Sequence, residues 1–162
     1  MVKVFQMKYR PHGENRYKQF LKEDIVAIGW PGIGNLEGQS KEEIKKQLEG
    51  IYGLTSGRLG NALGAIWCFK NTMKDGDILL IRYKKKVSIG IIGPYQYIHS
   101  LDNDIDGYCH QRTIEWVETN EYLSLYNNAV QTVVRSPGIV TGSTYQVEDL
   151  DITTLLTKET TK

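Results

Sequence analysis

Aromatic and cationic side chains lie close together in the sequence between Lys74 and Trp116. Three consecutive lysines, Lys84 to Lys86, separate two strand-like runs, and Tyr95 and Tyr97 follow the second run. Aromatic rings stack on nucleobases and cations attract phosphate, so these two kinds of residue near strand ends suit a nucleotide. We therefore predict that this segment contributes to a nucleotide-binding surface, although a lysine run is also typical of a solvated turn that protects a sheet edge.

Two tryptophans have neighbours that bear on ligand binding. Gly29 and Pro31 fix the backbone around Trp30, so we expect its indole at the end of a strand. There it either plugs the end of a barrel or forms a wall for a base, and stacking on a base is worth about 1–3 kcal/mol. Trp116 shares a strand face with Ile114, which is compatible with the core as well as with a binding site.

Residues for catalysis do not form a recognisable set. The sequence contains no nucleophile elbow, no phosphate-binding loop and no Asp…Glu-x-Lys nuclease pattern. Asp102, Asp104 and Asp106 alternate as in a calcium loop, but Gly107 follows directly and the bidentate glutamate of such loops is missing. We therefore expect a binding domain with no catalytic residue, no metal site and no cofactor.

The composition is that of an ordinary globular protein with a real core, since 40% of the 162 residues are hydrophobic and 24% are charged. A net charge of +1 argues against a chain coated in basic charge, but it allows a local basic patch. No apolar run approaches the roughly 20 residues of a membrane span, and no signal peptide opens the chain. Cys68 and Cys109 have no metal-ligand spacing and fit a reducing compartment. We expect a cytoplasmic protein without a membrane partner.

The order of the predicted elements indicates an α+β fold. Ser40 and Glu43 form a capping box ahead of the clearest helix, and a turn at 75–77 precedes a hairpin. We predict a small, bent, mixed β-barrel of about six strands flanked by two or three helices, with residues 1–156 in one domain and 157–162 as a frayed tail or linker. The predicted strands are 2–7, 24–29, 78–83, 87–92, 111–117 and 130–134, and the main helices are 40–53 and 58–73.

An ordered set of segments, IVAIGWPGIGNL, a capped helix, AIWCFKNTMKDGDILLI, VSIGIIGPYQY and HQRTIEWV, resembles the EVE and YTH-like branch of the PUA-like superfamily. The set is most similar to the N-terminal reader modules of McrBC-like and Mrr-like modification-dependent restriction proteins. This resemblance covers roughly Phe5 to Val117. It implies a PUA-like fold that binds double-stranded DNA and flips a modified base into an aromatic cage. It also implies that a fused or partner GTPase or nuclease performs the cutting.

The resemblance assigns roles to individual residues. In these relatives one cage tryptophan follows the second strand and another stands in an Ile-x-Trp-Val segment, which match Trp30 and Trp116. The third wall stays open among four candidates: Tyr97, Tyr83, Leu125 and Tyr122. The expected contacts to the base edge or the backbone are Tyr9, Arg10, Asn15, Pro31, Lys84, Lys85, Lys86, Arg112 and Arg135.

Two other functions remain open from the sequence. The same fold could read modified RNA, in the manner of YTH and PUA relatives, and a competition between matched DNA and RNA strands separates these two functions. A small enzyme acting on nucleotides or nucleic acid is the third hypothesis, and it requires turnover by the isolated chain.

Overall fold

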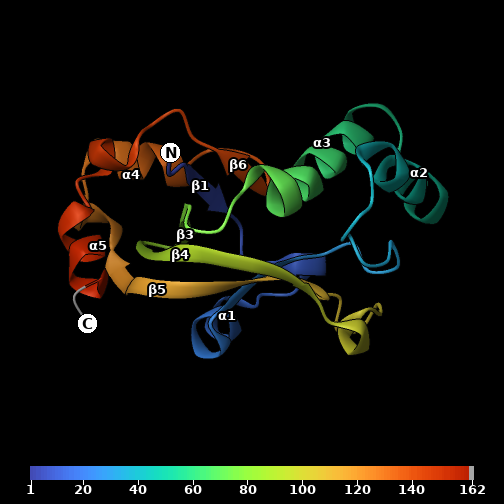
Figure 1. Ribbon diagram of the computed structural model, residues 1–162, viewed down its shortest axis with the longest axis horizontal. Helices are drawn as coiled ribbons and strands as arrows, with labels where there is room; N and C mark the ends of the chain where they lie inside the picture. The colour runs from blue at the N-terminus through green and yellow to red at the C-terminus, as the bar shows by residue number, and fades with distance from the viewer. Residues whose placement is uncertain (161–162) are drawn as a thin grey trace.

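One mixed sheet of six strands curls into a half-barrel in the computed structural model, which describes residues 1–160 and the side chains of residues 1–156 (Figure 1). The strand order is β2-β5-β4-β3-β1-β6, with β1 and β3 parallel and the other neighbours antiparallel. The predicted α+β class and the bent mixed sheet of about six strands are therefore confirmed. The strands are β1 (Val4–Met7), β2 (Ile25–Ile28), β3 (Ile78–Tyr83), β4 (Lys86–Tyr97), β5 (His110–Tyr122) and β6 (Val140–Gly142).

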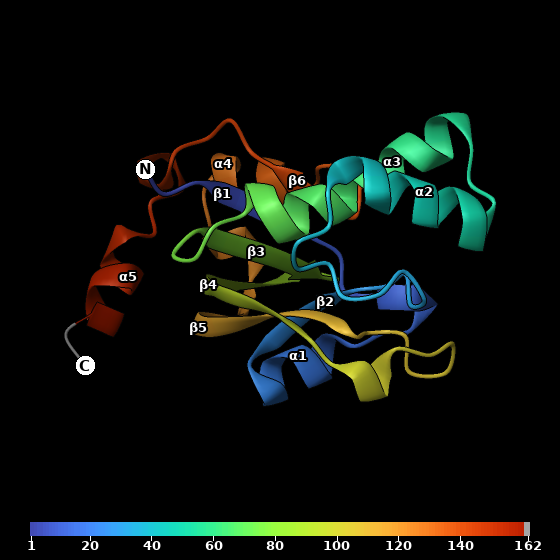
Figure 2. The same cartoon turned by 45° about the vertical axis from the view of Figure 1, so that its right-hand side comes forward.

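Among residues 1–160, five α-helices accompany this sheet, where two or three were expected. Figures 1 and 2 place α2 and α3 on the side of β1 and β6, whereas α1 lies beside β2 and β5. Within the described residues, none of the helices is both long and apolar enough to cross a membrane. The helices are α1 (Tyr17–Glu23), α2 (Lys41–Tyr52), α3 (Ser56–Trp67), α4 (Asn128–Val134) and α5 (Thr153–Thr160), and a π-helical turn (Cys68–Thr72) continues α3. Of the tail expected at 157–162, residues 161 and 162 lie outside the described residues.

The prediction of a strand at 130–134 is wrong, because these residues form most of α4. The side chain of Asn127 accepts a hydrogen bond from the backbone N–H of Val130 and caps the helix. Val130, Val133 and Val134 then recur at helical spacing and are buried. The cap and the burial of one helical face outweigh the β propensity of valine, and the sixth strand is β6 instead.

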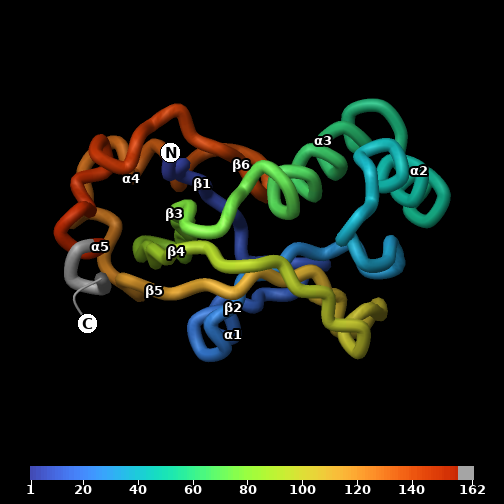
Figure 3. The backbone as a smooth tube through the Cα atoms, in the orientation of Figure 1, coloured from blue at the N-terminus to red at the C-terminus, as the bar shows by residue number. Residues whose placement is uncertain are grey.

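Both faces of β3 are covered, which explains its continuous apolar run. Leu79 and Ile81 belong to a large core that also includes residues of α2 and α3. Ile78 and Leu80 point to a smaller core that contains residues of α4. The tube in Figure 3 shows β4 and β5 running side by side away from this point, and they form the longest ladder of the sheet. The stretch of β3 that leads to the hairpin is therefore buried from two sides.

Arg112 lies inside the protein, although a surface contact was expected of it. Its side chain is 3% exposed, and its Nη1 donates to the carbonyls of Phe69 and Met73 at 2.9 and 2.7 Å. Its Nε donates to the carbonyl of Gly93, and its Nη2 pairs with the Asp75 carboxylate. The guanidinium thus ties the end of the π-helical turn to β4 and β5, and in this structure it is not available to a ligand.

Replacing Arg112 by glutamine should destabilise the fold. Several buried carbonyls lose their donor, at about 1–3 kcal/mol each, so we expect the free energy of unfolding to fall by about 3 kcal/mol. Denaturant unfolding measures this change. The control Arg135→Gln removes an exposed guanidinium and should change stability by less than about 0.5 kcal/mol. Equal effects of the two substitutions would contradict the role given to Arg112.

Candidate nucleic-acid interface

Three tyrosines pack together at the hairpin end of β3. The parallel register pairs Gln6 with Leu80, so continuing it by three residues brings Tyr9 beside Tyr83. The ring centroids of Tyr9 and Tyr83 are 4.9 Å apart in an edge contact, and Tyr17, at the start of α1, stacks on Tyr83 at 4.5 Å. Such pairs add about 0.5–1.5 kcal/mol to their area burial, so the cluster is a rigid platform.

The phenol of Tyr17 is held by a hydrogen-bond network. Its hydroxyl lies 2.6 Å from Ser88 Oγ and donates to Asn120 Oδ1 at 2.9 Å, while the backbone N–H of Asn120 donates to Ser88 Oγ. Burial raises the pKa of Tyr17 above its ordinary value. Asn120 adopts a left-handed backbone with a φ of 54°, which asparagine tolerates better than most residues. The network therefore fixes the Asn120 amide at the edge of β5.

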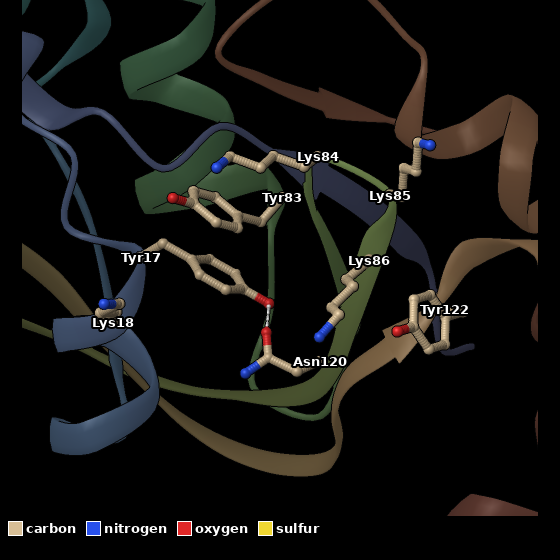
Figure 4. A pocket seen from close by; sticks show the side chains of 8 residues that line it. All are labelled: Tyr17, Lys18, Tyr83, Lys84, Lys85, Lys86, Asn120 and Tyr122. Carbon is tan, nitrogen blue, oxygen red and sulfur yellow. Dashed lines mark hydrogen bonds between the residues drawn. The ribbon is translucent and has the colours of Figure 1, made fainter.

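A cavity of about 500 Å³ opens beside this platform, and we call it the tyrosine cavity. Figure 4 shows Tyr17 and Tyr83 on one side, Tyr122 across from them and Lys86 between. Tyr122 is 56% exposed, and the Lys86 ammonium lies 5.2 Å from the centroid of its ring. A flat group entering the cavity would thus meet aromatic rings and cations together. The lining residues are Tyr17, Lys18, Tyr83, Lys84, Lys85, Lys86, Asn120 and Tyr122.

The tip of the β3–β4 hairpin carries two of these lysines. Tyr83 pairs with Lys86, so Lys84 and Lys85 form a two-residue turn, where three turn lysines were expected. Lys84 has a φ of 57°, a left-handed conformation that costs a residue other than glycine about 1–2 kcal/mol. Arg82 supports the turn because its Nε donates to the Lys84 carbonyl at 2.8 Å. The backbone that carries Lys84 and Lys85 is therefore supported in a tight turn.

Positive charge is concentrated around the tyrosine platform. A second cavity of about 370 Å³, which we call the basic pocket, is lined by Met7, Lys8, Tyr9, Arg82, Lys84, Val134 and Arg135. Together the two cavities carry seven of the chain's 20 lysines and arginines, and neither lining contains an acidic residue. Within the described residues, none of these seven forms an ion pair with a carboxylate. The electrostatic potential at this surface is therefore positive, which attracts anions.

Trp30 lies at a different place, just beyond the end of β2. Its φ of 60° is left-handed. A Cβ on the preceding Gly29 would come within 2.6 Å of the backbone nitrogen of His12. The predicted position of the indole at a strand end is therefore observed. Trp30 borders a groove of about 820 Å³ beside α3, and a cavity of about 260 Å³, the tryptophan cavity. The tryptophan cavity is lined by Arg10, Pro11, His12, Gly13, Gly29, Trp30, Tyr52 and Ile139.

Trp116 is not beside Trp30. In the β2–β5 ladder Ile28 pairs with His110, and Trp30 follows this end of the ladder. Trp116 lies six residues along β5 in the opposite direction, roughly 20 Å away at about 3.3 Å per residue. Its indole is half-buried, and its Nε1 donates to the carbonyl of Phe20 at 3.2 Å. The two tryptophans therefore stand at opposite ends of β2 and do not face each other.

The remaining expected site residues divide between these regions. Tyr9, Asn15 and Lys84 join Tyr83 at the hairpin end, where the Asn15 amide lies 3.4 Å from the Tyr83 hydroxyl. Arg10 lines the tryptophan cavity, and buried Pro31 follows Trp30. Three others lie outside both the tyrosine cavity and the tryptophan cavity. The hydroxyl of Tyr97, the last residue of β4, donates to the Asp102 carboxylate. Leu125 is exposed after β5, and Arg135 lines the basic pocket.

Sequence reasoning missed Tyr17, Lys18 and Asn120 as lining residues of the tyrosine cavity. Tyr17 begins a short helix far from the hairpin in sequence, and only the fold brings it to Tyr83. Asn120 had a usable signal, since an asparagine within a β-rich stretch often marks a left-handed residue. That signal indicates a bend in the strand and does not identify what the side chain faces.

A buried histidine fixes the backbone around Trp30. His110 is fully buried, with Nε2 3.2 Å from the Trp30 carbonyl and Nδ1 2.9 Å from the Tyr95 hydroxyl. Because a carbonyl only accepts, Nε2 carries the proton and Nδ1 accepts from Tyr95, whose oxygen accepts in turn from the Leu36 N–H. Burial lowers the pKa of His110 to about 4, so the neutral ring is the native form at neutral pH.

This histidine should make stability depend on pH in acid. The pKa of His110 is lowered from 6.5 to about 4 in the folded chain. As the pH falls between these values, the unfolded chain binds a proton that the folded chain does not. Stability is then lost, by about 3 kcal/mol at about 1.4 kcal/mol per pKa unit.

The measurement is the free energy of unfolding at pH 7 and at pH 4.5. His110→Gln keeps a donor for Trp30 and should show a clearly weaker loss over this range. The control His99→Gln removes an exposed histidine and should leave the pH dependence of the parent unchanged. The same slope in His110→Gln as in the parent would contradict this account.

Comparison with known proteins places the chain in a family. Residues 5–145 match a family model described as a domain of unknown function, DUF8426. No curated protein matches the chain. No solved structure matches it either. Because the family model covers most of the sequence, the chain belongs to the DUF8426 family.

Proposed function

We propose that this protein is a nucleic-acid-binding domain whose contact surface is centred on the tip of the β3–β4 hairpin. The observation that carries the proposal is the group of seven cations around the stacked Tyr17 and Tyr83 rings, none of them paired with a carboxylate in the described residues. The net charge is only +1, so the rest of the chain is slightly acidic. A local cationic surface of this kind binds phosphates at one place and does not coat the protein with nucleic acid.

The tyrosine cavity has the chemistry to hold a single unstacked base. Tyr122 offers an exposed ring, and base stacking on such a ring is worth about 1–3 kcal/mol. The Oδ1 of Asn120 is occupied by Tyr17, which leaves its Nδ2 to donate to the edge of a base. Contacts of both kinds offset the few kcal/mol that are needed to take a base out of a stack.

The resemblance noted above extends this proposal to a modified base in double-stranded DNA. In that function the domain recognises the methylated site, and a fused or partner GTPase or nuclease cuts the DNA. The geometry supports the tyrosine cavity over a cage made by Trp30 and Trp116, because the β2–β5 register separates these two side chains. Tyr83, one of the candidates for a third wall, then becomes a main wall.

The nucleic-acid part is tested with Lys85→Glu, which reverses an exposed charge at the hairpin tip. Losing one phosphate contact and adding repulsion should weaken binding of a 20-nucleotide duplex roughly tenfold at low salt. Fluorescence anisotropy measures the dissociation constant, with a matched RNA duplex as a second ligand. Lys46→Glu on the outer face of α2 changes the net charge equally and should have less than about a twofold effect. Equal losses in both variants, or no binding by the parent to either duplex, would overturn the proposal.

The base-holding part needs duplexes with one methylated adenine, one methylated cytosine or no modification. Tyr122→Ala should lower affinity for the preferred modified duplex by about 1–3 kcal/mol, whereas Tyr122→Phe keeps the ring and should bind like the parent. Trp30→Ala separates the two cavities. Unchanged binding by Trp30→Ala rejects a cage at Trp30, and unchanged binding by Tyr122→Ala rejects the tyrosine cavity.

A further inference from the structure

The basic pocket lies on the opposite side of the β3 end from the tyrosine cavity. The strand order places β4 and β5 on one side of β3 and β1 and β6 on the other. Residues of β4 and β5 line the tyrosine cavity, whereas the end of β1 and the end of α4 line the basic pocket. Lys84 lines both, and the edge contact between Tyr9 and Tyr83 separates them. An extended ligand would therefore have to pass Lys84 to occupy both cavities.

The fold forces cations together in this pocket. The parallel register of β1 and β3, continued by two residues, sets Lys8 opposite Arg82. Lys8 is half-buried, and its ammonium donates to the Ser136 carbonyl at 2.8 Å, next to Arg135. Burial and the neighbouring Arg82 charge lower the pKa of Lys8. The three side chains arrive from β1, β3 and the end of α4, so their meeting follows from the tertiary structure.

In the part of the chain that the structure describes, no carboxylate neutralises these charges, although Arg135 Nη2 donates to the Gln131 side chain at 3.3 Å. Among the described residues, Lys8, Arg82 and Arg135 form no ion pair, and Arg82 uses only its Nε, on the Lys84 carbonyl. Its two terminal amino groups stay available for an anion in the described structure. Arginine presents such donors as a planar fork that matches two oxygens of a phosphate. A phosphate in the pocket would relieve the repulsion between Lys8 and Arg82.

We propose that the basic pocket is a phosphodiester subsite, which binds the strand on one side of the nucleotide whose base occupies the tyrosine cavity. The inference rests on the proposed function and narrows its substrate. Lys18, Lys85 and Lys86 line the tyrosine cavity, and Lys8, Arg82 and Arg135 line the basic pocket, so the backbone is held on both sides of the base. The ligand is then a nucleotide within a continuous strand, in preference to a free nucleotide or the end of a strand.

The experiment uses 12-nucleotide single strands with one 2-aminopurine, placed either in the middle or at an end. The parent should bind the internal probe roughly tenfold more tightly than either terminal probe, with a change in fluorescence as the base leaves its neighbours in the strand. Arg82→Gln/Arg135→Gln should lose most of this preference. Its slope of log affinity against log salt should fall by about 1.4, since each phosphate contact contributes about 0.7 on single strands.

The control is Arg58→Gln/Lys46→Gln, on α3 and α2, which should keep the preference and the salt slope of the parent. The single variant Arg135→Gln keeps the contact between Arg82 and the turn, so it tests the pocket without disturbing the hairpin. It should lower the slope of log affinity against log salt by about 0.7. Inorganic phosphate distinguishes the source of the anion. If millimolar phosphate occupies the pocket while internal and terminal probes bind the parent equally, the pocket is a free-phosphate site and the inference fails.

Failure of this inference differs from failure of the proposed function. An unchanged preference and salt slope in Arg82→Gln/Arg135→Gln, together with weaker binding by Lys85→Glu, would reject the phosphodiester subsite and keep the nucleic-acid interface. Absence of binding by the parent to every single strand and to every duplex would reject both.

Discussion

The parallel register between β1 and β3 determines what the hairpin end of the sheet can do. Because the two strands run in the same direction, both end on the same side of the sheet. Their last residues then lie together, with Tyr9 beside Tyr83 and Lys8 beside Arg82. A slip by one residue would place a tyrosine opposite a cation and turn alternate side chains to the other face. The register is protected because β3 is buried on both faces between two cores. Hydrophobic burial in the middle of the strand therefore sets the chemistry at its end.

The sequence predicted the elements that are strongly periodic and missed the contacts that depend on the fold. The capped helix α2 and the β3–β4 hairpin follow from local signals, and both are present. The valine-rich stretch at 130–134 was misassigned because the cap at Asn127 and burial against the smaller core decide its state. No local signal distinguishes a buried guanidinium from an exposed one, so the place of Arg112 under the π-helical turn could not be predicted.

The candidate site shows the same division. The lysine run was singled out because cations and aromatics adjoin in the sequence, whereas Tyr83 was only one of four candidates for a third cage wall. Tyr17 reaches them only through the packing of α1, and Lys8 and Arg135 only through the ends of β1 and α4. The two tryptophans illustrate the opposite error. Each has suggestive neighbours, but strand pairing places them at opposite ends of β2.

The left-handed backbone at Lys84 sets stability and binding against each other. Glycine at this position would relieve the unfavourable conformation of the turn and should make the hairpin more stable. It would also remove the one cation that both cavities share. Screens for heat-resistant variants should therefore favour substitutions at this turn that remove a cation from the proposed site, a conflict expected where a strained residue serves a site. Residue 84 is thus a poor choice for engineering a more stable domain that keeps the proposed site intact.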